Sequence, residues 1–161
     1  LQGRPRTRPP LVALRLDFLT AAPVFTSLRR SSQGNEQRVE AESLARIPER
    51  YIGDLRLRVQ AYRRIAGCTE LGEIKSLRAE LRDRYGKPPL GVELLLRCAE
   101  VKILAGRAGV EMVETREDKI ILTQRGVVYQ VGGKFPRLTQ TKPDGKLTEI
   151  KQPLESLRRN R

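Results

Sequence analysis

Residues that commonly carry out catalysis are sparse in this sequence. It contains no histidine, which excludes Ser-His-Asp and Cys-His nucleophile systems and every zinc site that includes a histidine. Its two cysteines, Cys68 and Cys98, are too few for a zinc site made of cysteines alone. Their spacing and helix-like surroundings favour two separate buried thiols in a reducing cytoplasm over a disulfide.

The nucleotide-binding loops are missing as well. A Walker A loop has the pattern G-x-x-x-x-G-K-[ST]. Upstream of Gly133-Lys134 the first glycine is replaced by Val128, and Phe135 stands where Ser or Thr is needed. Gly145-Lys146 fails in the same way, and no G-x-G-x-x-G occurs. We therefore predict no catalytic, cofactor-binding or metal-binding residue, and we expect that the chain is not an enzyme by itself.

The acidic cluster that comes closest to a possible functional site lies on a predicted strand and its turn. A solvated strand edge is the ordinary explanation for carboxylates in such a place, and we expect that here. The cluster consists of Glu111, Glu114, Glu117 and Asp118.

The net charge of +13 favours polyanionic partners, although a soluble domain with many arginines is the plainer interpretation. A nucleic-acid-binding module that contacts DNA phosphates is one hypothesis, with Arg56, Arg63 and Arg64 as phosphate contacts. Aromatic residues for base stacking are scarce, and no known DNA- or RNA-binding motif is present. The other arginines that support the hypothesis are Arg58, Arg158, Arg159 and Arg161.

The ends and the hydropathy of the chain indicate whether it is a fragment and where in the cell it is located. The sequence begins at Leu1 without an initiator methionine, and we expect a fragment of a longer protein. No stretch approaches the ~20 apolar residues of a membrane span, and no signal peptide is visible. We therefore expect a cytoplasmic protein without a membrane partner.

The N-terminal part reads as one strand between irregular segments. Residues 1–10 are rich in Pro and Arg and are expected to be flexible. Residues 11–19 alternate, with Val12, Leu14, Leu16 and Phe18 on one face, which predicts a half-buried strand. Residues 26–45 are polar and predict a long, partly disordered loop. Residues 1–45 thus form an extension, and 46–161 the main domain.

Three helices are predicted over 54–66, 70–85 and 90–108. Asp54 and Thr69 are plausible N-caps, because their side-chain oxygens can accept free amide hydrogens of the first turn. Gly67, Gly86 and Gly109 suit the helix ends. The predicted buried stripes are Leu55, Val59, Tyr62 and Ala66 on the first helix, Leu71, Ile74, Leu77, Leu81 and Tyr85 on the second, and Val92, Leu95, Leu96, Ala99 and Ile103 on the third.

After Gly109 the apolar period changes from helical to alternating. Residues 110–113 and 119–122 flank a turn and predict a hairpin, and 127–131 predict a third strand. A short helix is expected over 147–157, with a new turn or a kink at Pro153. The predicted fold class is α+β: a three-helix core with an antiparallel β-meander, an N-terminal strand and a short C-terminal helix.

Residues 47–89 resemble one known family. The family pattern is roughly I-P-x-x-Y-I-P-D, a helix with L-R-L-x-x-Y-R-R, and a second helix ending E-L-x-D-R-[FY]-G-x-x-P. At the corresponding places the chain has IPERYIGD, then Leu57-Arg58 and Tyr62-Arg63-Arg64, and then ELRDRYGKPP. It is similar to the C-terminal domain of bacterial transcription-repair coupling factor (Mfd) over about 47–110, and less closely over the rest. Gly53 departs from the proline of the pattern but leaves the Asp54 cap.

The resemblance implies a parent protein with ATP-driven, helicase-like DNA translocase activity. Such a parent displaces stalled RNA polymerase and recruits nucleotide excision repair through UvrA. The C-terminal domain would dock on the N-terminal UvrB-like region of the same protein and mask the UvrA-binding surface. The motor residues themselves are absent from this chain.

The second predicted helix offers residues for such a contact. Glu80, Asp83 and Arg84 lie at i, i+3 and i+4, so they can share one face of the helix. Charged pairs at a docking face set register and specificity more than affinity. The plain alternative is that Asp83 and Arg84 only solvate the end of the helix, where a cation also suits the helix dipole.

Overall fold

The computed structural model describes residues 11–20 and 43–160. The predicted flexible segment 1–10 and most of the predicted loop 26–45 lie outside the described residues. The α+β class is confirmed, with helices and strands in the expected order. The elements are β1 (Ala13–Leu16), the 3-10 helix η1 (Asp17–Leu19), α1 (Leu55–Gly67), α2 (Leu71–Tyr85), α3 (Leu90–Arg107), β2 (Met112–Arg116), β3 (Lys119–Gln124), β4 (Val127–Val128) and α4 (Pro143–Arg159).

Local signals place most of the helix ends. An Asp54 carboxylate oxygen accepts a hydrogen bond from the Leu57 amide at 3.1 Å, as expected of an N-cap. Gly86 ends α2 with a φ of 85°, a conformation that glycine adopts without steric cost. The Thr69 cap is wrong. Glu70 holds the N-cap position without a side-chain bond, and Glu73 reaches back to accept from the Thr69 amide at 2.8 Å.

The four strands form one mixed sheet in the order β1-β2-β3-β4. β1 is parallel to β2, whereas β2-β3 and β3-β4 are antiparallel. The predicted third strand is too long, because the chain leaves the ladder after the Tyr129 amide donates to the Leu122 carbonyl. The N-terminal strand is also shorter than predicted. η1 turns the chain after Leu16, so that Leu19 is buried and Phe18 is half-buried.

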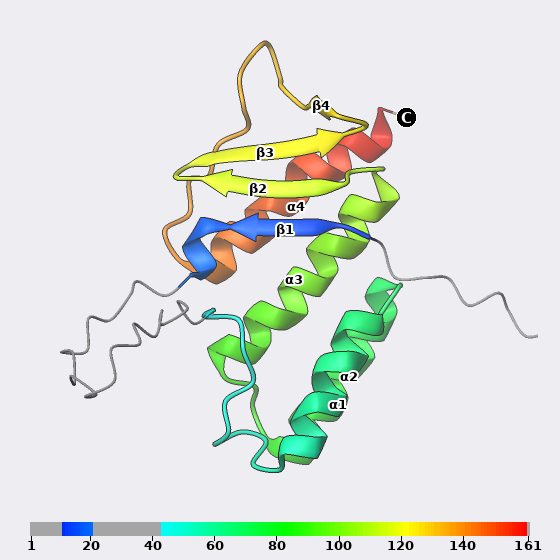
Figure 1. Ribbon diagram of the computed structural model, residues 1–161, viewed down its shortest axis with the longest axis vertical. Coiled ribbons are helices and arrows are strands. Elements are labelled where there is room, and N and C mark those ends of the chain that lie inside the picture. Colours follow the sequence, from blue (N-terminus) through cyan, green and yellow to red (C-terminus); the bar gives the residue numbers. More distant parts are fainter. Residues whose placement is uncertain (1–10, 21–42, 161) are drawn as a thin grey trace, which may run out of the picture.

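Two hydrophobic cores share α3. Figure 1 shows the sheet with α4 behind it at one end of the molecule, α1 and α2 at the other, and α3 reaching from one end to the other. The sequence predicted one buried side for α3, but a second side packs against the sheet and α4, and Leu95 is only half-buried. Residues of α3 in the helical core include Val92, Leu96 and Ile103, and those in the sheet core include Leu94, Val101 and Leu104.

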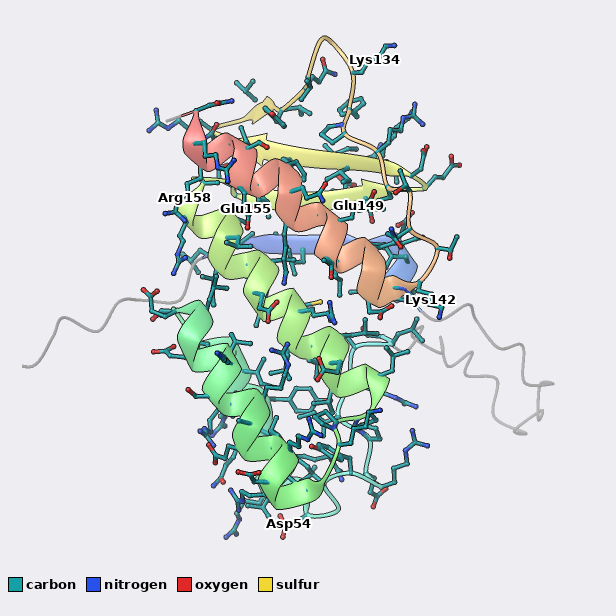
Figure 2. All side chains as sticks on the ribbon, turned by 180° about the vertical axis from the view of Figure 1, so that it is seen from behind. Asp54, Lys134, Lys142, Glu149, Glu155 and Arg158 are labelled. Atoms are coloured by element: carbon teal, nitrogen blue, oxygen red, sulfur yellow. The ribbon has the colours of Figure 1, made fainter. Side chains whose placement is uncertain are left out.

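The C-terminal helix α4 is longer than predicted. It begins at Pro143, a residue suited to the first turn because its missing amide hydrogen would have no partner there. The helix also continues through Pro153 (Figure 2), instead of restarting there. The proline cannot donate a helix hydrogen bond. The packing of three almost fully buried residues, Leu147, Ile150 and Leu154, compensates for this loss and keeps the segment helical. None of the described helices combines the length and the apolarity needed to cross a membrane.

Candidate docking surface

The core fixes the orientation of α2. Leu77 and Leu81 are buried, with 3% and 4% of their surface exposed, as their spacing predicted. The Tyr51 hydroxyl bonds the carbonyl oxygens of Leu81 and Gly86 at 3.0 and 2.9 Å, and its ring lies 5.7 Å from that of half-buried Tyr85. The C-terminal end of α2 is therefore held firmly, and its other side faces solvent.

On that side the structure brings Glu80 and Arg84 together and adds Arg64 from α1. Arg64 donates two hydrogen bonds to the Glu80 carboxylate, both at 2.7 Å, and Arg84 lies 3.7 Å from it. The hydrogen bonds from Arg64 lower the pKa of Glu80, with a further contribution from Arg84. Glu80 is therefore an anion enclosed by two cations, and it links α1 to α2.

Asp83 and Arg84 are more available to a partner. Both are exposed, and the Asp83 side chain forms no hydrogen bond or ion pair with any other described residue. The Arg84 guanidinium lies 5.3 Å from the centre of the Tyr85 ring, which orients it over an aromatic face. These two residues offer one anion and one cation on a rigid helix end.

The arginines of α1 fall into two groups. Arg58 donates to the Ile52 and Gly53 carbonyls at 2.9 and 3.2 Å, and Arg64 bonds Glu80, so both have internal roles. Arg56 and Arg63 are exposed, and their side chains form no hydrogen bond or ion pair with the residues that the structure describes. Arg158 and Arg159 are exposed in the last turn of α4, and Arg161 lies outside the described residues.

The predicted buried stripe of α1 is wrong. Leu55, Val59 and Tyr62 are 66%, 39% and 38% exposed, and Ala66 is exposed too. The helix instead buries Ala61 and Ile65 and half-buries Leu57, a second set at i, i+4 and i+8. Both sets have helical spacing, so periodicity alone could not choose between them. The choice follows from where α2 and α3 lie.

The acidic cluster is split among separate partners. Glu111 accepts from the Arg125 amide at 2.9 Å, Glu114 pairs with Arg116 at 3.2 Å, and Asp118 pairs with Arg137 at 2.6 Å. Such pairs agree with the solvated strand edge that we expected. Within residues 11–20 and 43–160, no group of three or more His, Cys, Asp or Glu side chains is arranged to hold a metal ion.

Comparisons with known proteins agree on one family. A family model described as the TRCF domain matches residues 42–128. The chain is 34% identical over 88 residues to the transcription-repair-coupling factor of Bacillus subtilis, covering 55% of this chain and 8% of that protein. It is 29% identical over 106 residues to the protein of the same name from Haemophilus influenzae, covering 66% of this chain and 8% of the relative. The chain thus spans less than a tenth of the length of either.

A solved structure has a similar fold. The crystal structure of a C-terminal domain of transcription-repair coupling factor aligns with a TM-score of 0.53 and 22% sequence identity. The alignment covers 73% of this chain and 90% of that domain.

Proposed function

The chain belongs to the TRCF domain family, and from this premise we propose that it is an interaction module that restrains its parent protein. In this proposal the domain docks on the N-terminal UvrB-like region of the same protein and masks the surface that binds UvrA. The parent is the ATP-dependent DNA translocase that the resemblance implies, which displaces stalled RNA polymerase. The domain itself contributes no catalytic residue.

One observation carries the proposal: Asp83 and Arg84 stand exposed at the end of a helix whose opposite side is buried. A rigid helix face presents its charges at fixed positions, which favours a partner of complementary charge and disfavours others. The contact need not be strong, because tethering in one polypeptide gives a high effective concentration. A small polar interface therefore suffices to keep the domain docked and can still be released.

Glu80 has a double role in this arrangement. It lies on the same helix face as Asp83 and Arg84, and its carboxylate also holds Arg64. Substituting Glu80 would thus alter the docking face and loosen α1 at the same time. Asp83 and Arg84 are the better residues for a test, because their substitution leaves the Arg64 contact in place.

The test uses the full-length parent with Asp83→Ala and Arg84→Ala combined. We expect UvrA binding to rise several-fold while the melting temperature stays within about a degree, because exposed substitutions usually change stability by less than ~0.5 kcal/mol. The matched control is Lys75→Ala with Arg82→Ala, two exposed residues of α2 that lie about a quarter turn from Asp83 and nearly half a turn from Arg84. Unchanged UvrA binding in the first variant, or an equal rise in the control, would refute this docking face.

A second candidate function, DNA binding through phosphate contacts, is favoured by Arg56 and Arg63, which are exposed and whose side chains have no partner among the described residues. Arg64 is a weaker candidate than the sequence suggested, because Glu80 already holds its guanidinium. A phosphate-driven complex loses affinity steeply as salt is added. Duplex binding that weakens with salt, and that Arg56→Gln with Arg63→Gln abolishes, would support this function.

A further inference from the structure

An open apolar groove lies between α1 and α3. It has a volume of about 150 Å³, and Tyr62 and Ala66 of α1 face Leu95, Cys98 and Lys102 of α3 across it. The Tyr62 hydroxyl accepts a hydrogen bond from the Ile47 amide at 2.7 Å, which fixes the aromatic wall of the groove. Its lining is mainly carbon and sulfur, and none of the described residues that line it is acidic.

The exposed stripe of α1 extends this groove along the helix. Leu55, Val59 and Tyr62 lie at i, i+4 and i+7, so they share one side of α1. From Leu55 to Ala66 the stripe runs roughly 16 Å at a rise of about 1.5 Å per residue. Aliphatic side chains continuous with a groove form a larger apolar surface than single exposed residues would.

Basic side chains flank the stripe. α1 carries four arginines and no carboxylate, and two of the arginines bond within the domain. The other two, Arg56 and Arg63, lie seven residues apart and roughly 60–100° around the helix from the stripe. Lys102 is exposed on the α3 side of the groove. An apolar strip between cations is complementary to a segment with an apolar side and acidic edges.

We infer that the α1–α3 groove, with the stripe Leu55–Val59–Tyr62, is a docking site for an acidic amphipathic helix of another protein. A helix that lies in a groove uses apolar anchors at the spacing of the stripe. Duplex DNA fits less well, because aliphatic side chains occupy the middle of the basic surface. A second copy of this chain is disfavoured because both copies would carry a net charge of +13.

This site is separate from the α2 docking surface. On α1, Arg64 points to Glu80 of α2, and at about 100° per residue it lies roughly opposite Leu55 and Ala66. The domain can therefore hold its parent with one side and a second protein with the other. The inference does not depend on the proposed function.

The test measures binding of a synthetic peptide to the 161-residue chain by fluorescence anisotropy. The peptide is a helix of about five turns with Leu at i, i+4, i+7 and i+11 and Glu at its flanking positions. A control peptide has the same composition with the Leu positions scrambled. We expect saturable binding that is at least tenfold weaker for the scrambled peptide, because charge alone does not fill the groove.

Variants of the chain locate the site. Val59→Asp should weaken binding at least tenfold, and Leu55→Asp serves as a second variant if the first is poorly folded by circular dichroism. Val127→Asp, which alters an exposed valine on β4, should leave binding within twofold, as should Asp83→Ala with Arg84→Ala. The bound peptide should also slow alkylation of Cys68, which is one of the residues that line the groove.

Several outcomes would overturn the inference. These are an absence of saturable binding, equal binding of the scrambled peptide, and equal losses for Val59→Asp and Val127→Asp. Sedimentation that shows a dimer broken by Val59→Asp would assign the stripe to a second copy of the chain instead. Complete displacement of the peptide by duplex DNA, with DNA binding unaffected by Val59→Asp, would assign the surface to nucleic acid.

Discussion

Arg64 and Glu80 join α1 to α2 through two parallel hydrogen bonds, each 2.7 Å long. Sixteen residues separate them in the sequence, and the helices they come from carry the two candidate surfaces. At about 100° per residue, Arg64 lies on the side of α1 roughly opposite the exposed Leu55, Val59 and Tyr62. The contact thus lies between the candidate docking surface of α2 and the exposed stripe of α1.

This pair should make stability depend on pH in the acid range. Arg64 lowers the pKa of Glu80 below its ordinary value of 4.5. The stabilising contribution is therefore fully present above the unfolded-state pKa and is lost as the pH falls through the folded-state pKa. Glu80→Gln should lower the melting temperature at pH 7, and the effect should become smaller as the pH is lowered to 3. Glu155→Gln, at an exposed site on α4, is the control, and an equal loss at both pH values would contradict this role.

Asp17, the first residue of η1, supports the β2–β3 turn. Its carboxylate accepts from the Glu117 amide and from the Thr115 hydroxyl, both at 2.7 Å, and Glu117 has a φ of 56°. Asp17→Ala should destabilise the fold by about 1–3 kcal/mol in urea unfolding, because both donors lose a charged acceptor. Glu117→Gly should instead stabilise it by about 1 kcal/mol, because glycine adopts this φ without strain. Destabilisation by both substitutions would refute the idea of a strained turn.

Gly91 lets the segment before α1 approach α3. A Cβ atom at this position would lie 2.5 Å from the Arg46 carbonyl oxygen and 3.1 Å from that of Leu44. Gly91→Ala should therefore cost about 1–3 kcal/mol, as overpacking usually does. The matched control is Gly72→Ala in α2, where a Cβ would meet nothing within 4 Å, and we expect it to stabilise by about 0.5–1 kcal/mol. Thermal melts of the two variants should shift in opposite directions, and a shift in the same direction would count against the close approach.

Cys98 should react slowly with alkylating agents. Burial raises the pKa of its thiol to about 11, although Lys102 acts in the opposite direction. The thiolate is the reactive form, so the alkylation rate should still be rising above pH 9. Mass spectrometry after timed treatment with iodoacetamide would measure the rate at each pH, and unfolding in urea should bring it to the rate of an ordinary cysteine. A plateau near pH 8.5 in the folded chain would contradict the expected burial.

The sequence alone was sufficient to predict those features that depend only on residues close together in the chain. The Asp54 cap, the end of α2 at Gly86 and the hairpin between residues 110 and 124 follow from hydrogen bonds or backbone preferences within a few residues. The family could also be recognised from one continuous stretch of sequence. The motif at the end of the second helix in that stretch led to the hypothesis about the docking residues. Such features depend little on what packs against them.

Tertiary structure decided the features on which the sequence was ambiguous or silent. α1 has two apolar sets with helical spacing, and only the positions of α2 and α3 bury Ala61 and Ile65 and leave Val59 exposed. α4 continues through Pro153 because buried residues on either side of the proline pack against the core. Helix propensities of single residues do not include this stabilisation. The Arg64–Glu80 pair likewise joins two helices. Burial and ion pairing between distant segments depend on where the chain returns in space, and a periodic pattern does not contain that information.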